Sequence, residues 1–219
     1  MSIGILGKKV GMTRVYDDKG VATPVTVIEA NPSIVCQVKT VEKDGYASYQ
    51  LGYDDVIEKR TTKPRLGHFK KNGITPKRIL REFDYEGEEL KVGDEVGVKR
   101  FSAGQLIDII GVGKGRGFQG VVKRHNFSGQ HESHGSMMHR RPGAIGAGST
   151  PGRIFKNQPM PGHHGAREVT VQNLRVVQVR EDDHVLLVKG AVPGPNGGYV
   201  VVRSAIKGQK KVATNGDNK

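Results

Sequence analysis

Residues 105–120 read QLIDIIGVGKGRGFQG, and the character of the chain changes within this stretch. Residues 105–112 are rich in isoleucine and valine, in a pattern that suits a buried β-strand. Glycine and basic residues then take over, beginning with Lys114 and Arg116. The stretch therefore predicts the point at which a basic extension leaves a folded β-domain.

The predicted extension covers residues 111–167 and has too few apolar residues to build a core. It holds nine basic residues against one acid, Glu132, with thirteen glycines, four prolines and six of the chain's eight histidines. Between Ser128 and Arg167 the branched aliphatic residues are Ile145 and Ile154 alone. Burial of so few apolar side chains cannot offset the entropy lost on ordering the segment. Because the 219-residue chain has a formal net charge of +13, we expect its partner to be a polyanion.

Two interpretations fit this extension. The first is a flexible linker, but linkers repeat Gly, Ser or Pro without larger side chains. This segment is instead punctuated by apolar residues such as Phe118, Met137 and Phe155. The second interpretation is an arm that orders against a nucleic acid, which then supplies the missing core. The composition favours the arm.

On both sides of the extension the sequence predicts short β-strands joined by turns. Residues 12–16 and 21–29 flank the turn sequence DDKG, and residues 34–40 and 46–53 flank EKDG, so each pair predicts a hairpin. Several short strands at this spacing are typical of a closed β-barrel. Further strands are expected at residues 92–101, 105–112, 169–180, 184–189 and 199–204, and the best short helix at residues 75–83.

The predicted fold class is mainly β: a closed β-barrel of short strands, with a long, largely irregular basic extension inserted between two of them. The barrel domain is discontinuous and comprises residues 1–110 and 168–207. Residues 111–167 form the extension, and residues 208–219 are expected to be a solvated tail. The N-terminal residues lack an apolar signal region and no run approaches the ~20 apolar residues of a membrane helix. We therefore expect a cytosolic protein with no membrane partner.

One glycine-rich motif resembles a nucleotide-binding loop. Residues 115–120 (GRGFQG) match the G-x-G-x-x-G spacing. A dinucleotide site also needs a helix opening at the last glycine and an acid about 20 residues further on. Residues 121–127 look β-like and the nearby acid, Glu132, lies within the extension, so an enzyme built on this loop is kept only as an alternative. The glycines are better suited to bringing the main chain close to a phosphate backbone.

Metal binding and catalysis are not expected. His131 and His134 are three residues apart, whereas the zincin motif needs four. The single cysteine, Cys36, cannot form an intrachain disulfide, and no acid is placed to orient a histidine toward Ser136. The sequence therefore predicts no catalytic residue, metal, cofactor or small-molecule substrate.

The arginines of the extension favour folded RNA over duplex DNA. Residues 140–143 (RRPG) and 151–153 (PGR) place guanidinium groups, which bind phosphate in a bidentate manner and stack on bases, beside stiffening prolines. The irregular mixture of residues suits one irregular RNA surface. No helix-turn-helix or zinc finger is visible. A nonspecific DNA-compacting protein is the remaining alternative.

Several longer runs carry a resemblance to a known family. They include ILGKKVGMT at residues 5–13, KGRGFQG at 114–120, VTVQNL at 169–174 and VKGAVPG at 188–194. In these runs, and in colinear order along nearly the whole chain, the sequence resembles the universal large-subunit ribosomal protein three family in its bacterial form.

The resemblance implies a globular β-barrel on the outside of the large ribosomal subunit, with an extension that enters the rRNA. It also implies early binding in subunit assembly and an extension tip, residues 140–155, that positions rRNA near the peptidyl-transferase centre. The implied partners are large-subunit (23S-type) rRNA and neighbouring ribosomal proteins, in the cytoplasm. Some bacterial members have a methylated glutamine near the tip. This chain reads Ala147-Gly148-Ser149 there, so no such modification is expected.

The candidate site consists of basic residues and histidines of the extension, with a subset at the tip. The expected rRNA-binding residues are Lys114, Arg116, Lys123, Arg124, His125, His139, Arg140, Arg141, Arg153, Lys156, His163, His164 and Arg167. The expected tip residues are Arg140, Arg141, Pro142, Gly143, Ser149, Thr150 and Arg153.

Overall fold

The computed structural model describes residues 4–84 and 89–208 and divides the chain into two compact units. The globular unit combines Met1–Val112 with Glu168–Lys219, and the extension unit is Gly113–Arg167. Of the predicted tail, residues 209–219 lie outside the described residues.

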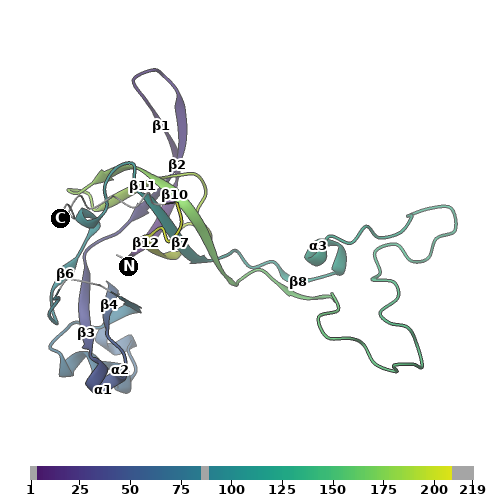
Figure 1. The fold of residues 1–219 in the computed structure, drawn as a ribbon, viewed down its shortest axis with the longest axis horizontal. Helices are drawn as coiled ribbons and strands as arrows, with labels where there is room; N and C mark the ends of the chain where they lie inside the picture. The colour runs from purple at the N-terminus through teal and green to yellow at the C-terminus, as the bar shows by residue number, and fades with distance from the viewer. Residues whose placement is uncertain (1–3, 85–88, 209–219) are drawn as a thin grey trace, which may run out of the picture. The chain divides into compact units, whose positions relative to one another are not determined.

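Six antiparallel strands of the globular unit form a closed barrel (Figure 1). Neighbouring strands follow the order β1-β12-β7-β10-β11-β2, and β2 pairs with β1 to close the barrel. The N-terminal strand therefore lies beside the last strand of the chain. The structure confirms the predicted fold class, a mainly β protein with a closed barrel. The bounds are β1 Gly4–Tyr16, β2 Ala22–Glu29, β7 Leu106–Val112, β10 Glu168–Arg180, β11 Val185–Lys189 and β12 Tyr199–Ser204.

Alternating burial along the strands explains why the barrel closes. In β12, Val200 and Val202 are buried while the residues between them are half-buried. On the neighbouring strand β7, Ile107 and Ile109 are fully buried. Side chains on alternate positions point to the same face of a strand, and in a small barrel that face fills the interior. The two-residue period thus packs the core, with the exception of Asp108 between the two isoleucines of β7, which is also buried.

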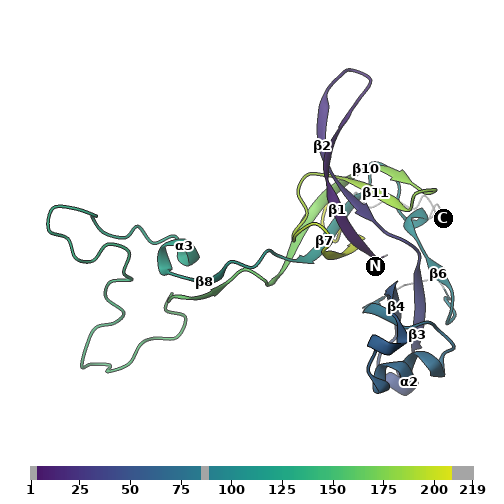
Figure 2. The same ribbon diagram turned by 180° about the vertical axis from the view of Figure 1, so that it is seen from behind.

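Strands β1 and β2 continue beyond the barrel as a hairpin (Figures 1 and 2). The predicted turn joins them. The carboxylate of Asp17 accepts hydrogen bonds from the main-chain N–H groups of Lys19 at 3.1 Å and Val21 at 2.7 Å. Such a local bond holds the turn without help from the rest of the fold. The prediction of this hairpin is confirmed.

The strands expected at residues 34–40 and 46–53 do pair with each other, but they do not belong to the barrel. They form a second sheet of four strands in the order β5-β4-β3-β6. The chain leaves the barrel after β2 through Pro32, which has no N–H to continue a ladder. Val35 and Leu51 of this sheet nevertheless share one hydrophobic core with Ile5 of the barrel. The bounds are β3 Ser33–Lys39, α1 Val41–Asp44, β4 Ser48–Asp55, β5 Lys77–Phe83 and β6 Glu95–Val96.

The helix expected at residues 75–83 is wrong, because Lys77–Phe83 is strand β5. This strand pairs with β4 from Tyr49 opposite Phe83 to Asp55 opposite Lys77, and such pairing overrides a weak local helical pattern. The helix in this region is α2, Lys63–Lys71, which has a proline in its first turn and buries Phe69. Among the described residues, no helix is long and apolar enough to cross a membrane.

The long strand expected at residues 92–101 is also wrong. Only Glu95–Val96 is a strand, and a 3₁₀ turn, η2 (Val98–Arg100), follows it. Val98 begins this turn and Phe101 follows its last residue, and both side chains are buried. A turn with about three residues per repeat directs both side chains to the core, whereas a strand would place them on opposite faces.

The extension unit is inserted between two adjacent strands of the barrel. β7 ends at Val112 and β10 begins at Glu168, and these two residues are paired. The register of this pair shifts between Val171 and Leu174. At the shift, the buried carboxylate of Asp108 accepts a hydrogen bond from the N–H of Asn173 at 2.9 Å. Its other oxygen accepts one from the N–H of Ile206 at 3.4 Å, so one side chain ties β7 to β10 and to the segment after β12.

We expect Asp108→Ala to lower the free energy of unfolding by about 1–3 kcal/mol, because it leaves two part-buried main-chain N–H groups without their acceptor. The measurement is urea unfolding followed by circular dichroism. The matched control is Asp182→Ala in the exposed turn after β10, expected to change stability by less than about 0.5 kcal/mol. Equal losses in the two variants would contradict a structural role for Asp108.

Candidate nucleic-acid interface

The extension unit begins as a two-stranded ribbon. The N–H of Gly113 donates to the carbonyl of Arg167 at 2.9 Å. Further along, β8 (Gly117–Gln119) pairs antiparallel with β9 (Gly162–His164). Two legs far apart in the sequence are thus held side by side. The ribbon brings together five of the predicted rRNA-binding residues: Lys114, Arg116, His163, His164 and Arg167.

A glycine permits the close approach of the two legs. Gly165 has a φ of +74°, and a Cβ there would lie 2.2 Å from the carbonyl oxygen of Lys114. Any larger residue would therefore separate the legs or strain the backbone. The geometry of the ribbon therefore accounts for the glycine at position 165 without a contact to nucleic acid.

Arg116 and His164 form the electrostatic centre of the ribbon. A guanidinium nitrogen of Arg116 lies 3.1 Å from Nε2 of His164. Because arginine can only donate, Nε2 accepts and the imidazole is neutral. Partial burial lowers the pKa of His164, and the charges of Arg116 and Arg167 lower it further. The histidine therefore adds a hydrogen-bonding ring to the site without adding charge at neutral pH.

A short helix, α3 (Val121–His125), follows the ribbon. Residues 121–127, which looked β-like in the sequence, are therefore largely helical, and that prediction is wrong. Gly120 caps the helix in an extended conformation, and Asn126 ends it with a φ of 60°. The extended conformation of Gly120 and the positive φ of Asn126 set the two ends of the helix, and the strand-like composition of residues 121–127 does not predict either.

Two of the predicted binding residues also hold the unit together. The guanidinium of Arg124 donates to the carbonyl of Met160, and Nε2 of His125 lies 3.1 Å from the same oxygen. The side chain of Arg124 also packs against Gly162. Sequence reasoning missed Met160, because a main-chain carbonyl becomes an acceptor through the fold and leaves no signal in residue type.

Residues 126–161, all of which are described, contain neither helix nor strand. Local turns organise them. The N–H of Gln130 donates to the carbonyl of His139 at 2.7 Å, and the N–H of Arg141 to that of Met138 at 2.9 Å. The guanidinium of Arg153 lies 5.9 Å from the centre of the Phe155 ring, which suits a cation–π contact.

A shallow cavity of about 390 Å³ gathers part of the predicted tip. It is lined by residues 126–130 and by Arg141, Pro142 and Gly143. An aromatic ring at Phe127 and a guanidinium at Arg141 are the groups on which unpaired bases stack. Ser149 and Thr150 lie instead in a turn closed by the bond between Gly152 and Gly148.

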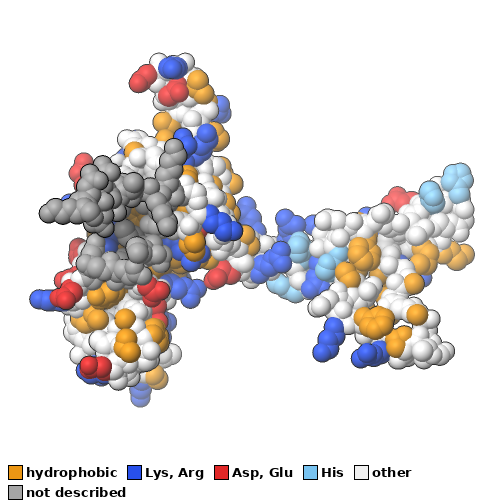
Figure 3. Space-filling view, viewed as in Figure 1, with side chains coloured by type: hydrophobic (Ala, Val, Ile, Leu, Met, Phe, Trp, Pro, Cys, Tyr) orange, Lys and Arg blue, Asp and Glu red, His pale blue; other side chains and the backbone are white. Residues whose placement is uncertain are grey.

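The extension unit has almost no core of its own. Across the fully described range Gly113–Arg167, Val121 is the one buried apolar side chain. Phe118, Met137 and Phe155 are 76%, 82% and 61% exposed. Figure 3 shows apolar side chains and histidines on the surface of this unit. Side chains of this kind, spaced between cations, are what single-stranded and irregular RNA stacks against.

The cations of the extension unit are not neutralised within the protein. In residues 4–84 and 89–208, none of its nine lysines and arginines forms an ion pair, and neither does Glu132. Nine such charges in one unit repel each other unless a polyanion approaches. The unpaired charges are those of Lys114, Arg116, Lys123, Arg124, Arg140, Arg141, Arg153, Lys156 and Arg167.

The glycine motif at residues 115–120 does not form a dinucleotide site. Its strand, β8, pairs antiparallel with β9, and the helix after it has five residues. A dinucleotide fold needs a parallel βαβ unit. The described residues also contain no cluster of three or more potential metal ligands.

The fold and the site together define a class: a β-barrel protein with an inserted, coreless cationic segment suited to RNA. The family model described as Ribosomal protein L3 matches residues 55–185 of the chain. A large ribosomal subunit protein uL3 from Akkermansia muciniphila is 52% identical over 94% of this chain and 100% of its own length. Proteins of the same name from Acidothermus cellulolyticus and Geobacillus kaustophilus are 52% and 48% identical, over 94% and 96% of this chain and 94% and 99% of their own lengths.

The chain belongs to the ribosomal protein L3 family. This confirms the resemblance seen in the sequence. Members of the family are structural proteins of the large ribosomal subunit and not enzymes.

We expect Arg116→Gln to raise the pKa of His164, because it removes a cation beside the imidazole. The pKa is measured by NMR titration of the histidine ring protons in the full chain. Arg153→Gln is the matched control, since it removes an arginine that lies against Phe155 rather than His164. A pKa unchanged in Arg116→Gln would contradict the ribbon geometry.

Proposed function

We propose that the protein binds large-subunit (23S-type) rRNA through its extension unit and so acts as a structural constituent of the large ribosomal subunit. The observation that carries the proposal is that Gly113–Arg167 combines one buried apolar side chain with nine cations that form no ion pair among the described residues. A segment that lacks a core orders stably only when a partner supplies burial and charge. Folded RNA supplies both, through bases that stack and phosphates that bind arginine.

The tip residues give this proposal its finer form. Arg140, Arg141 and Arg153, with the neighbouring Pro142 and Ser149, would position rRNA near the peptidyl-transferase centre and support early subunit assembly. All are exposed, and Arg141 lines the cavity with Phe127. The protein would work in the cytoplasm, where bacterial ribosomes are, beside neighbouring large-subunit proteins.

Sedimentation tests the proposal directly. A tagged full-length chain is expressed in a bacterial host, and the lysate is run on a sucrose gradient at moderate salt and again after a high-salt wash. Nonspecific binding weakens steeply with salt, by a log–log slope of about 0.7–0.9 for each neutralised phosphate. Retention in the large-subunit peak after the wash is expected. A tag found only at the top of the gradient, or equal competition by duplex DNA, would indicate another partner.

We expect the double substitution Arg140→Ala and Arg141→Ala to weaken rRNA binding and leave the barrel folded. The salt slope of binding to transcribed 23S rRNA should fall by about 1.4, from two lost phosphate contacts at ~0.7 each. The melting temperature of the free protein should stay within about 2 °C, because both side chains are exposed and unpaired among the described residues.

The matched control is Arg14→Ala with Arg180→Ala, which removes two exposed arginines from the globular unit. A slope that falls equally in both double variants would mean that only net charge matters. A drop of many degrees in melting temperature for the Arg140 and Arg141 variant would place these residues in the folded core and contradict the proposed architecture.

A further inference from the structure

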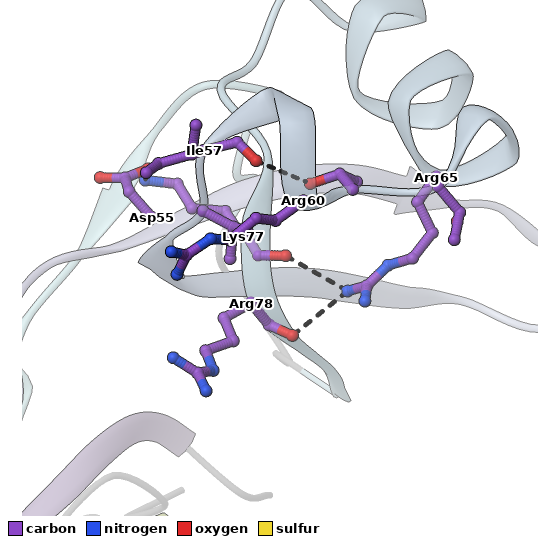
Figure 4. A pocket seen from close by; sticks show the side chains of 9 residues that line it. Asp55, Ile57, Arg60, Arg65, Lys77 and Arg78 are labelled. Atoms are coloured by element: carbon purple, nitrogen blue, oxygen red, sulfur yellow. Dashed lines mark hydrogen bonds and ion pairs between the residues drawn. The ribbon is translucent and has the colours of Figure 1, made fainter.

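The globular unit has a cationic cavity of its own. It has a volume of about 420 Å³ and lies between the end of β4, the 3₁₀ turn η1 (Glu58–Arg60), the start of α2 and the start of β5. Figure 4 shows the side chains that line it and the elements from which they come. The residues that matter for its chemistry are Asp55, Arg60, Thr62, Arg65, Lys77 and Arg78.

Basic residues are denser around this cavity than in the extension. Residues 58–78 hold eight lysines and arginines and one acid, Glu58, so their net charge is +7 in 21 residues. The extension reaches +8 only over residues 111–167. A charge of this density needs either internal acids or an external anion.

The one acid that lines the cavity, Asp55, is paired with a lysine. A carboxylate oxygen of Asp55 lies 2.7 Å from Nζ of Lys77 and accepts a hydrogen bond from the Thr75 hydroxyl at 3.0 Å. The hydrogen bond from Lys77 lowers the pKa of Asp55, so the carboxylate is charged at neutral pH. Lys77 is 7% exposed. Lys77 is therefore neutralised by Asp55, while the three arginines of the cavity form no ion pair within residues 4–84 and 89–208.

Arg65 fixes the shape of the cavity. One terminal nitrogen of its guanidinium donates to the main-chain carbonyls of Lys77 and Arg78, both at 3.2 Å (Figure 4). This side chain joins the first turn of α2 to the start of β5. Its positive charge remains at the cavity, since both acceptors are neutral carbonyls.

Arg60 and Arg78 are the groups available to a ligand. Both are exposed, and within residues 4–84 and 89–208 neither guanidinium forms a hydrogen bond or an ion pair. Arg78 lies 5.9 Å from the centre of the Tyr199 ring, which limits its range of positions without neutralising it. The hydroxyl of Thr61 donates to the main-chain carbonyl of Ile57 at 3.5 Å, whereas that of Thr62, which lines the same cavity, adds an uncharged donor.

We propose that this cavity binds a phosphodiester group of large-subunit rRNA, so that the globular unit makes an RNA contact separate from that of the extension. Two guanidinium forks and the Thr62 hydroxyl at one cavity supply the donors that the oxygens of a phosphate accept from. The inference rests on the proposed function, since it takes the RNA to be the same molecule.

The surroundings favour RNA over an acidic protein segment. The basic residues continue past the cavity to Lys59, Lys63 and Lys70, all exposed, which suits an anion that repeats along a polymer. A protein partner would be anchored mainly by aromatic or aliphatic side chains in an apolar pocket. The lining here is instead dominated by arginine, lysine and threonine.

Binding of the full chain to transcribed 23S rRNA at several salt concentrations tests the inference. Arg60→Gln with Arg78→Gln should lower the log–log salt slope by about 0.7–0.9, from the one phosphate contact of the cavity, and raise Kd at 0.1 M salt about tenfold or more. The matched control is Arg14→Gln with Arg180→Gln, which removes equal charge away from the cavity. It should change the slope by less than about 0.5. Melting temperatures of the two variants should agree with the parent within about 2 °C.

A second measurement separates RNA from protein as the occupant. Photoreactive benzoylphenylalanine is placed at position 62 of the full chain, and large subunits that contain it are irradiated. Crosslinks to rRNA are expected. Crosslinks to protein alone, or none, would overturn the inference.

The two proposals fail in different ways. If the parent chain does not enter the large-subunit peak, the proposed function itself is wrong. If the parent enters the peak and the Arg60 and Arg78 variant binds rRNA like its control, only the cavity inference is wrong.

Discussion

The pairing of β7 with β10 is the constraint on which the rest of the structure depends. Val112 and Glu168 are the outermost pair of these strands, so the extension leaves the barrel and returns to it at two neighbouring positions. Because the ends are held together, the insertion needs no additional strand and does not interrupt the barrel. The entropic cost of bringing the two ends of a loop together grows only slowly with the length of the loop, so a long insertion is tolerated at this position. Asp108 secures this arrangement from inside the core, where its carboxylate bonds to the main chain at the register shift of β10.

The packed core and most of the net positive charge lie in different parts of the chain. The globular unit buries aliphatic side chains from both of its sheets in one cluster, whereas the extension unit buries Val121 alone among its apolar residues. The extension is held by main-chain bonds of a ribbon, by Gly165 and by the contact of Arg124 with Met160. Its nine lysines and arginines form no ion pair within the part of the chain that the structure describes. This division explains how a protein of +13 net charge folds, since most of the repulsion lies outside the packed core.

The sequence was informative where a signal is local. Two-residue alternation in β12, the Asx turn at Asp17 and the change in composition after residue 112 each depend on neighbours along the chain. Sequence patterns predicted the wrong element where strand pairing or a backbone conformation at the end of the element sets the secondary structure. Residues 75–83 form a strand because β4 lies beside them, and residues 121–125 are helical between two backbone caps. The sequence also contains the dense positive charge of residues 58–78. A net charge taken over all residues outside 111–167 hides it, because the acids elsewhere in that part of the chain offset it.

The sequence alone determined the class of fold and the cationic character of residues 111–167, because composition and short-period patterns carry that information. Only the tertiary structure decided that the strands divide into a barrel and a second sheet, since strand partners are chosen by the shared core and not by the strands themselves. It also decided which charges are available. Lys77 is neutralised by Asp55, 22 positions earlier, while Arg60 and Arg78 are left without an acid among the described residues. Ion pairing depends on distances of a few ångströms in space, which spacing along a chain does not specify.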